Sequence, residues 1–232
     1  MISKRISLLL ALTVCSVCLL VNPAHAETWK ITSLDWQPYS GSDMANQGES
    51  VNKLKELLKK EGIDLVVEFY PWTRAQKLAQ TKDYIGYFPA WPEEVKEGFV
   101  ASPPVDWSYI GVMTYAGSAA KWESVDQLFS QYRVGIIDSY EYPKEIADAV
   151  KKYPDHVKLA GDETALVKML ASKTRFEVAL TDPNVMQYHA KLQKMDNIQV
   201  LNPSIQKKEL VISLRNDEAN KKVIERLNKL LQ

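Results

Sequence analysis

Short β-like runs alternate with amphipathic helical runs along most of this chain, and the alternation sets the class of fold that the chain can adopt. In the first half, strand patterns lie at 29–34, 65–69 and 84–88, and helical patterns lie at 50–60 and 73–80. The second helical pattern opens with the capping-box spacing of Thr73 and Gln76. An order of β-α-β-α-β is typical of a parallel sheet covered by helices, so we predict an α/β fold.

A long extended stretch at 105–115 and the small residues at 116–120 interrupt this alternation, which then restarts. Because ligands of such sheets bind at the carboxyl ends of the strands, the expected site is a crevice between two lobes. We expect hinge strands near 113–117 and 206–210. The predicted lobes are residues 27–115 with 209–232, and residues 116–208. In the second half we expect strands at 133–137, 157–159, 176–180, 198–201 and 210–214, and helices after Ser124 and at 143–152, 162–171, 183–191 and 217–231.

The segment at 1–26 has the pattern of a cleavable secretory signal peptide. Lys4 and Arg5 precede an apolar run at 6–21, and Ala24-His25-Ala26 supplies small residues at the expected cleavage site. The alternative, an N-terminal membrane anchor, needs ~20 apolar residues, which is more than this run offers. Both cysteines lie inside the segment, so we expect an exported protein without a disulfide bond.

Composition and motifs exclude several classes of function. The 29 basic and 29 acidic side chains balance, so nothing favours a nucleic-acid partner. The sequence lacks a Gly-x-Ser-x-Gly elbow, a glycine-rich phosphate loop and a His-Glu-x-x-His motif, so we expect no catalytic residues, no cofactor and no metal. His156 lies in a polar turn and His189 near a helix end, where we predict ordinary surface positions.

All six tryptophans lie between Trp29 and Trp122. We expect Trp29, Phe69 and Phe88 to fill a core, as large aromatic side chains usually do. Other aromatic residues follow predicted strands and lie beside prolines, so either a core position or a cleft position fits them. In a cleft they would stack on a ligand. These candidates are Trp36, Tyr39, Trp72, Tyr87 and Trp91.

A series of motifs runs through the whole chain after the signal segment. Asp35-Trp36-Gln37-Pro38-Tyr39 follows the first strand, Pro71-Trp72-Thr73-Arg74-Ala75 opens a helix, and Phe99-Val100-Ala101-Ser102-Pro103-Pro104 precedes the long extended stretch. In the second half, the strand and turn at 134–140 and the strand and helix at 176–188 continue the series. Taken in order, these segments resemble the bacterial extracellular solute-binding protein family 3, whose typical members are the amino-acid-binding proteins of ABC importers.

The resemblance implies an α/β, two-lobed fold of the periplasmic-binding-protein type (type II) with a central cleft. It implies a monomer in the periplasm that closes on a small polar solute by hinge motion and delivers it to the membrane permease subunits of an ABC importer. Ser139 and Asp182 would bond the ligand from the second lobe. Arg74 would point into the cleft or pair with Asp83. Asp182 also fits a second role as a helix cap.

The chain departs from this family at the positions that clamp a ligand carboxylate. Members that bind amino acids use a Thr and, three residues later, an Arg, whereas Pro92 and Val95 occupy those positions here. Lys96 lies beside them, in an acidic turn at 93–97 that we expect to be solvated. Asp138 replaces a Gly of the second-lobe turn and adds negative charge. These departures disfavour a standard amino acid and favour a neutral or cationic ligand.

Two alternatives to transport share the same fold. One is a periplasmic ligand sensor subunit, which the sequence does not separate from a transport protein. The other is an enzyme of the dehydratase kind, for which Glu93, Glu94 and Lys96 are candidates by their proximity in sequence. A fold alone does not decide between binding and catalysis.

Overall fold

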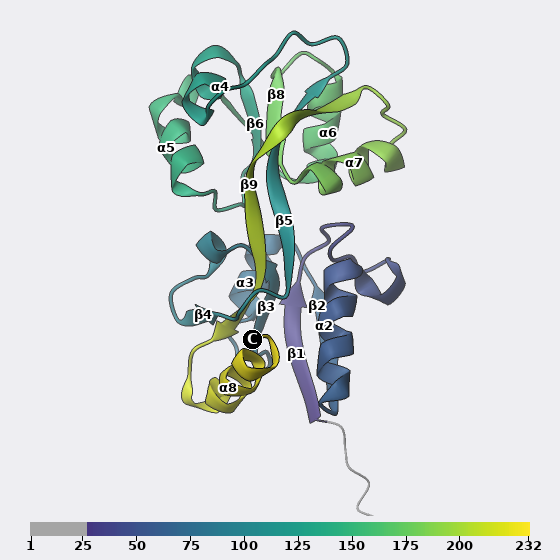
Figure 1. Cartoon of the computed structure of the whole chain (residues 1–232), viewed down its shortest axis with the longest axis vertical. Helices are drawn as coiled ribbons and strands as arrows, with labels where there is room; N and C mark the ends of the chain where they lie inside the picture. The colour runs from purple at the N-terminus through teal and green to yellow at the C-terminus, as the bar shows by residue number, and fades with distance from the viewer. Residues whose placement is uncertain (1–26) are drawn as a thin grey trace, which may run out of the picture.

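The computed structural model describes residues 27–232, so the predicted signal peptide at 1–26 lies outside the described residues. The described chain forms two lobes, which lie one above the other in Figure 1. Two long antiparallel strands, β5 (Asp106–Tyr115) and β9 (Ile198–Arg215), run between the lobes. Helices flank the strands in both lobes, and the predicted two-lobed α/β fold is confirmed.

The first lobe is built on a sheet with a parallel centre. β1 (Glu27–Ser33) pairs in parallel with β2 (Ile63–Phe69) and β3 (Gly86–Ala90). The end of β9 adds antiparallel pairs with β3 and with β4 (Phe99–Ala101). The helical elements of this lobe are η1 (Ala45–Gln47), α2 (Glu49–Lys60), α3 (Trp72–Leu78), η2 (Pro92–Glu94), η4 (Glu218–Asn220) and α8 (Lys221–Leu230).

The second lobe repeats this plan with its own parallel strands. β6 (Val134–Ile137) pairs in parallel with β7 (Val157–Ala160) and β8 (Val178–Thr181). Side-chain caps begin three of its helices, because the side chains of Ser124, Asp162 and Asp182 accept hydrogen bonds from main-chain N–H groups of the first turn. The helical elements are α4 (Val125–Gln131), α5 (Lys144–Lys152), η3 (Pro154–His156), α6 (Glu163–Ala171) and α7 (Pro183–Leu192).

Strand β9 is continuous where the sequence suggests two strands, so the prediction of separate strands at 198–201 and 210–214 is wrong. The polar residues between those runs belong to the part of β9 that passes from one lobe to the other. There, Gln206 and Lys207 remain exposed, and Lys207 lies 4.1 Å from the ring centre of Trp107 on β5. A strand that is not covered on both faces carries polar side chains without losing its ladder of hydrogen bonds.

The pairing of β5 changes partners along its length. Asp106 to Ile110 pairs with the C-terminal part of β9, and after a register shift Val112 to Tyr115 pairs with its N-terminal part. Gly111 to Met113 also pairs with β8 of the second lobe. β9 therefore joins the first-lobe strands β3 and β4 to β5, and β5 joins β9 to the second-lobe strand β8. The lobe boundaries given above stay predictions.

Two local predictions are wrong. Helix α3 begins at Trp72 after Pro71, so Thr73 lies exposed within the first turn and does not cap the helix. Pro71 already holds the extended conformation that ends the preceding strand, with φ −51° and ψ 138°. His189 is buried, not a surface residue, because α7 packs against α6 and its Nδ1 atom lies 3.2 Å from Thr164 Oγ1.

The apolar core follows the predicted pattern. Trp29 and Phe88 are buried, and Phe69 is partly buried against the same core. The inward face of α2 carries Val51, Leu54 and Leu58, as its amphipathic period requires. Among residues 27–232, no helix combines the length and apolar character needed to cross a membrane.

Candidate ligand-binding cleft

A cleft of about 500 Å³ lies between the two lobes. Its first-lobe wall consists of residues that follow β1 and β2, and its second-lobe wall consists of residues that follow β6 and β7. The carboxyl ends of parallel strands from both lobes therefore meet at this cleft, as the strand order predicts. We call it the outer cleft; it is lined by Leu34, Asp35, Phe69, Tyr70, Pro71, Trp72, Thr73, Ile137, Ser139, Tyr140, Gly161, Asp162 and Glu163.

An aromatic pocket, which we call the inner pocket, lies deeper and shares Leu34, Trp72 and Tyr140 with the outer cleft. The ring centres of Trp36 and Trp91 lie 6.1 Å apart and those of Trp91 and Tyr140 5.7 Å apart, both in edge-to-face geometry. The free space is about 10 Å³, roughly the volume that one water molecule needs. The inner pocket is lined by Leu34, Trp36, Trp72, Pro89, Trp91, Glu94, Tyr140 and Leu210.

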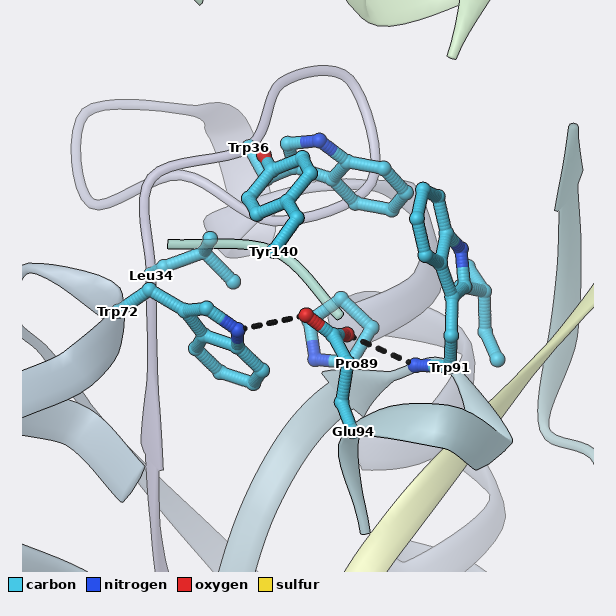
Figure 2. Close-up of a pocket in the computed structure, with 8 residues that line it drawn as sticks. Leu34, Trp36, Trp72, Pro89, Trp91, Glu94 and Tyr140 are labelled. Carbon is cyan, nitrogen blue, oxygen red and sulfur yellow. Dashed lines mark hydrogen bonds between the residues drawn. The ribbon is translucent and has the colours of Figure 1, made fainter. Parts of the chain in front are cut away.

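A buried carboxyl group, that of Glu94, faces the inner pocket. Figure 2 shows it between the Trp72 indole and the main chain of Trp91: Oε1 accepts from Trp72 Nε1 at 2.7 Å, and Oε2 accepts from Trp91 N at 3.0 Å. Glu94 is 5% exposed, so its expected place in a solvated turn is wrong. The short helix η2 turns its last residue inward. Burial raises the pKa of the Glu94 carboxyl to about 7, although these two N–H donors, the charge of Lys96 and the main-chain N–H of Glu141 oppose the rise.

A second buried carboxyl group comes from the other lobe. Glu163 is the first residue of α6 and is 5% exposed. Its Oε1 atom accepts a hydrogen bond from Tyr140 Oη. Burial raises the pKa of Glu163 to about 7, the negative charge of Asp162 adds to the rise, and the Trp36 indole of the first lobe opposes it. The charges of both Glu94 and Glu163 raise the pKa of Tyr140, so the two carboxyl groups lie near the same tyrosine.

Neither carboxyl group was identified as a ligand-binding candidate from the sequence. Glu94 lies in a run of charged residues. Its side chain accepts from the main-chain N–H of Trp91 three residues earlier, which is one half of a capping box, whereas the Trp91 indole has no acceptor for the other half. Glu163 follows the N-cap Asp162, where an acidic residue is common because it complements the helix dipole. Its sequence position therefore carries no signal of a site.

The structure brings together three of the predicted aromatic residues. Trp36, Trp72 and Trp91 line the inner pocket, and Ser139 lines the outer cleft. Tyr87 is fully buried behind the pocket, where its hydroxyl group donates to the carbonyl oxygen of Glu94 at 2.6 Å.

Arg74 lies at the exposed rim of the first lobe. Its guanidinium group lies 5.2 Å from the ring centre of Tyr70, a residue of the outer cleft. Within residues 27–232 it forms no ion pair with Asp83, so the pairing that the sequence offers as an alternative is not formed. A direct contact between Arg74 and a ligand stays a prediction.

Asp182 acts as a helix cap and also contacts the first lobe. Its Oδ1 atom accepts from the main-chain N–H groups of Asn184 at 2.7 Å and Val185 at 3.1 Å. Its Oδ2 atom accepts from Tyr109 N at 2.7 Å and Tyr39 Oη at 3.0 Å. All four contacts come from the protein, so the carboxylate is satisfied without a ligand. A ligand contact of Asp182 stays a prediction.

Direct contacts between the lobes close the cleft at two places. Tyr39 of the first lobe bonds Asp182 and accepts from Asn184 Nδ2 at 2.9 Å. Lys96 bonds Glu141 of the second lobe, with 2.7 Å between Nζ and Oε1. The lobes are therefore in a closed arrangement.

The charge of the site is negative. Asp35, Asp162 and Glu163 line the outer cleft and Glu94 lines the inner pocket, while no Lys or Arg of residues 27–232 lines either space. Within the same residues, no group of three or more His, Cys, Asp or Glu side chains is placed to hold a metal ion. The arrangement suits a ligand with positive charge and an apolar or aromatic-compatible body.

Comparison with known proteins supports the fold. No family model matches the chain, and no curated protein matches it. A histidine kinase sensor domain with similarity to periplasmic binding proteins is 15% identical, with 89% of this chain and 90% of that chain covered and a TM-score of 0.73. An ancestral arginine-binding protein bound to arginine is 17% identical, with 89% and 92% covered and a TM-score of 0.71.

A third similar structure is an ancestral amino acid-binding protein described as a precursor of cyclohexadienyl dehydratase. It is 20% identical, with 88% of each chain covered and a TM-score of 0.65. At these identities the likeness concerns the fold. It confirms the expected two-lobed architecture of periplasmic binding proteins.

Proposed function

We propose that this chain is a periplasmic solute-binding protein that captures a small polar solute between its lobes and delivers it to an ABC importer, as a divergent relative of the extracellular solute-binding protein family 3. The observation that carries the proposal is the cleft itself, which is built from strand ends of both lobes and crossed by hydrogen bonds between them. The signal-peptide pattern supports export to the periplasm.

The connection between the lobes supports a hinge mechanism. β5 and β9 join the two lobes, and the pairing of β5 with β9 shifts register between Ile110 and Val112. A bend in these two strands would separate the lobes without disturbing either sheet. A ligand that contacts both walls would stabilise the closed arrangement relative to an open one.

The test is a ligand screen on the exported form, residues 27–232. Amino acids, amines, sugars and organic acids are each added in thermal unfolding experiments, because a ligand that binds only the folded state raises the melting temperature. Small-angle scattering of the protein with and without each stabilising compound then measures lobe closure. The proposal is supported by a saturable rise with a more compact liganded state, and it fails if no compound of any class stabilises the protein.

A sensory role is a second candidate, favoured by the similarity to a histidine kinase sensor domain. The ligand would bind in the same cleft, but the liganded form would dock on a membrane receptor. Affinity capture from membranes of the source cells, with and without the ligand, separates the two roles. Recovery of permease subunits supports transport, and recovery of a receptor kinase supports sensing.

An enzymatic role is favoured by one observation. The pKa values of Glu94 and Glu163 are both raised to about 7, which suits proton transfer at neutral pH. Formation of a new product from any compound that stabilises the protein, followed by chromatography, would place catalysis ahead of binding.

A further inference from the structure

We propose that the outer cleft, together with the inner pocket that adjoins it, selects an organic ammonium cation that carries no carboxylate group. The body of the ligand would occupy the outer cleft of about 500 Å³, because the inner pocket has room for about one water molecule. The inference rests on the proposed function and names the class of ligand. Glu94 of the first lobe lines the inner pocket and Glu163 of the second lobe lines the outer cleft, so each lobe supplies one carboxyl group. The walls that would surround the cation are the rings of Trp36, Trp72, Trp91 and Tyr140.

The Glu94 carboxyl group has acceptor capacity that the protein does not use. An ionised carboxylate offers about four acceptor positions. Trp72 Nε1 and Trp91 N fill two of them, and the main-chain N–H of Glu141 in the second lobe is a third donor that acts on the group. Glu94 is nevertheless only 5% exposed to solvent, and it lines the inner pocket. An isolated buried carboxylate is unstable, so a bound cation is the partner that would allow it to ionise.

The charged groups around Glu94 leave this role open. The cation whose charge acts on its carboxyl is Lys96, and the Lys96 ammonium is bonded to Glu141 at 2.7 Å. The other titratable groups that face Glu94 are the hydroxyls of Tyr87, Tyr140 and Tyr142, which are neutral at physiological pH.

Among residues 27–232, Glu163 also has no ion-pair partner. Its carboxyl faces Tyr140 and the Trp36 indole, and its neighbour Asp162 adds a second negative charge. The Trp36 indole nitrogen is buried and makes no hydrogen bond of ordinary geometry within the described residues. The site therefore gathers acidic groups and aromatic rings from both lobes around the inner pocket and the outer cleft, which adjoin each other.

Aromatic walls complete the recognition of an ammonium ion. The negative face of an indole ring attracts a cation, and tryptophan does so more strongly than the other aromatic residues. Three tryptophans line the inner pocket, and its edge-to-face pairs hold the rings at angles to one another. A substituted ammonium ion would place its methylene or methyl groups against these rings and its charge near the carboxylates.

The same groups would exclude an α-amino acid. Its carboxylate would lie beside Glu94, Glu163 or Asp162, and like charges in a buried site are strongly unfavourable. No arginine of residues 27–232 lines the inner pocket or the outer cleft, and the guanidinium group of Arg74 lies over the ring of Tyr70. Discrimination would therefore come from repulsion of the carboxylate as well as from attraction of the amine.

The experiment uses ligand pairs that differ by one carboxylate group. Cadaverine is compared with lysine, agmatine with arginine, and choline with glycine betaine, by calorimetric titration of the exported form. We expect the amine of at least one pair to bind at least tenfold more tightly than its carboxylate partner. Equal or tighter binding of the carboxylate partner in every pair overturns the inference and needs no variant for its interpretation.

Two variants test the assigned carboxyl groups. Glu94→Gln and Glu163→Gln remove one charge each at nearly constant shape, and we expect each to weaken amine binding at least tenfold. Glu225→Gln, an exposed residue of α8, is the matched control. Unchanged amine binding by both site variants overturns the assignment. If a sugar or an organic acid stabilises the protein and no amine does, the proposed function stands and the ammonium inference falls.

Discussion

Tyr39 of the first lobe donates a hydrogen bond from its hydroxyl group to Oδ2 of Asp182 in the second lobe, over 3.0 Å. Asp182 is fully buried and also caps helix α7. The Tyr39 ring stacks on Trp36, with ring centres 4.8 Å apart, and Trp36 lines the inner pocket. One tyrosine therefore links the wall of the pocket to the contact that holds the lobes together.

Replacing Tyr39 by Phe should loosen this contact. The ring and its stacking remain, but the buried Oδ2 atom of Asp182 loses one of its two donors, which costs about 1 to 2 kcal/mol of folding free energy. We expect a larger radius of gyration in the absence of ligand and weaker ligand binding. Denaturant unfolding and small-angle scattering measure these effects.

Tyr188→Phe is the control for that change. Tyr188 lies on α7, the helix that Asp182 caps, and its hydroxyl group makes no hydrogen bond to the described residues. If Tyr39→Phe matches this control in both stability and radius, the hydrogen bond contributes nothing to lobe closure.

Stability should fall as the pH rises from about 5 to about 8. The pKa values of Glu94 and Glu163 are raised from 4.5 to about 7 by burial, so the folded state holds protons that the unfolded state releases. The resulting stabilisation is present in full below the unfolded pKa and is lost as the pH passes the folded pKa. Each group can contribute about 3 kcal/mol by this route.

Melting temperatures at unit intervals of pH test this dependence. Glu94→Gln and Glu163→Gln should each flatten the curve, because glutamine does not titrate. A wild-type melting temperature that rises across this range, or that changes in parallel with both variants, contradicts the assignment of the two pKa shifts.

The elements of the fold are predictable from local patterns. The inward residues of α2 recur at helical spacing, and the side chains of Ser124 and Asp162 cap the helices that follow them. The continuity of β9 is not a local property. Its polar centre resembles a loop in sequence, and it is held as a strand by β5, which lies far away in the chain.

The candidate site is predictable only where its residues follow from local patterns and from the strand order. Trp36, Trp72 and Trp91 each follow a strand, and strand ends of a parallel sheet converge, so their meeting is a consequence of topology. The burial of Glu94 depends on Trp72, 22 residues away, and on Tyr140 in the other lobe. A run of charged residues contains no local signal of such distant partners.

Amine binding should be linked to proton release. A cation pairs with ionised carboxylates, so its arrival would displace protons from Glu94 and Glu163 near their raised pKa values of about 7. Below pH 7, we expect the affinity for the amine to increase as the pH increases, by up to about tenfold per pH unit for each carboxyl group that must ionise. Titration calorimetry in buffers of different ionisation enthalpy measures the number of protons released. A pH-independent affinity with no proton release between pH 5.5 and 8 contradicts this coupling.

Glu93 should be important for folding stability, because it pairs with the buried Lys208. It should not contribute to the negative charge that selects the ligand. Lys208 lies on β9 with its side chain 4% exposed, and its Nζ atom lies 2.7 and 2.6 Å from the two carboxylate oxygens of Glu93. Glu93 precedes Glu94 in η2, so this ion pair fixes the short helix that carries the pocket carboxyl against the strand between the lobes.

Removal of one partner leaves a buried charge without its counter-ion, so we expect Glu93→Gln to lower the free energy of unfolding by about 3 kcal/mol. Asp148→Asn, which breaks an exposed pair with Lys144, should change it by less than about 1 kcal/mol. The double variant Glu93→Gln/Lys208→Met should recover most of the loss, because it removes the stranded ammonium group as well. Urea unfolding of these three variants and the wild type measures the changes in the free energy of unfolding. A loss in Glu93→Gln no larger than in Asp148→Asn would mean that water or another group compensates Lys208 without Glu93.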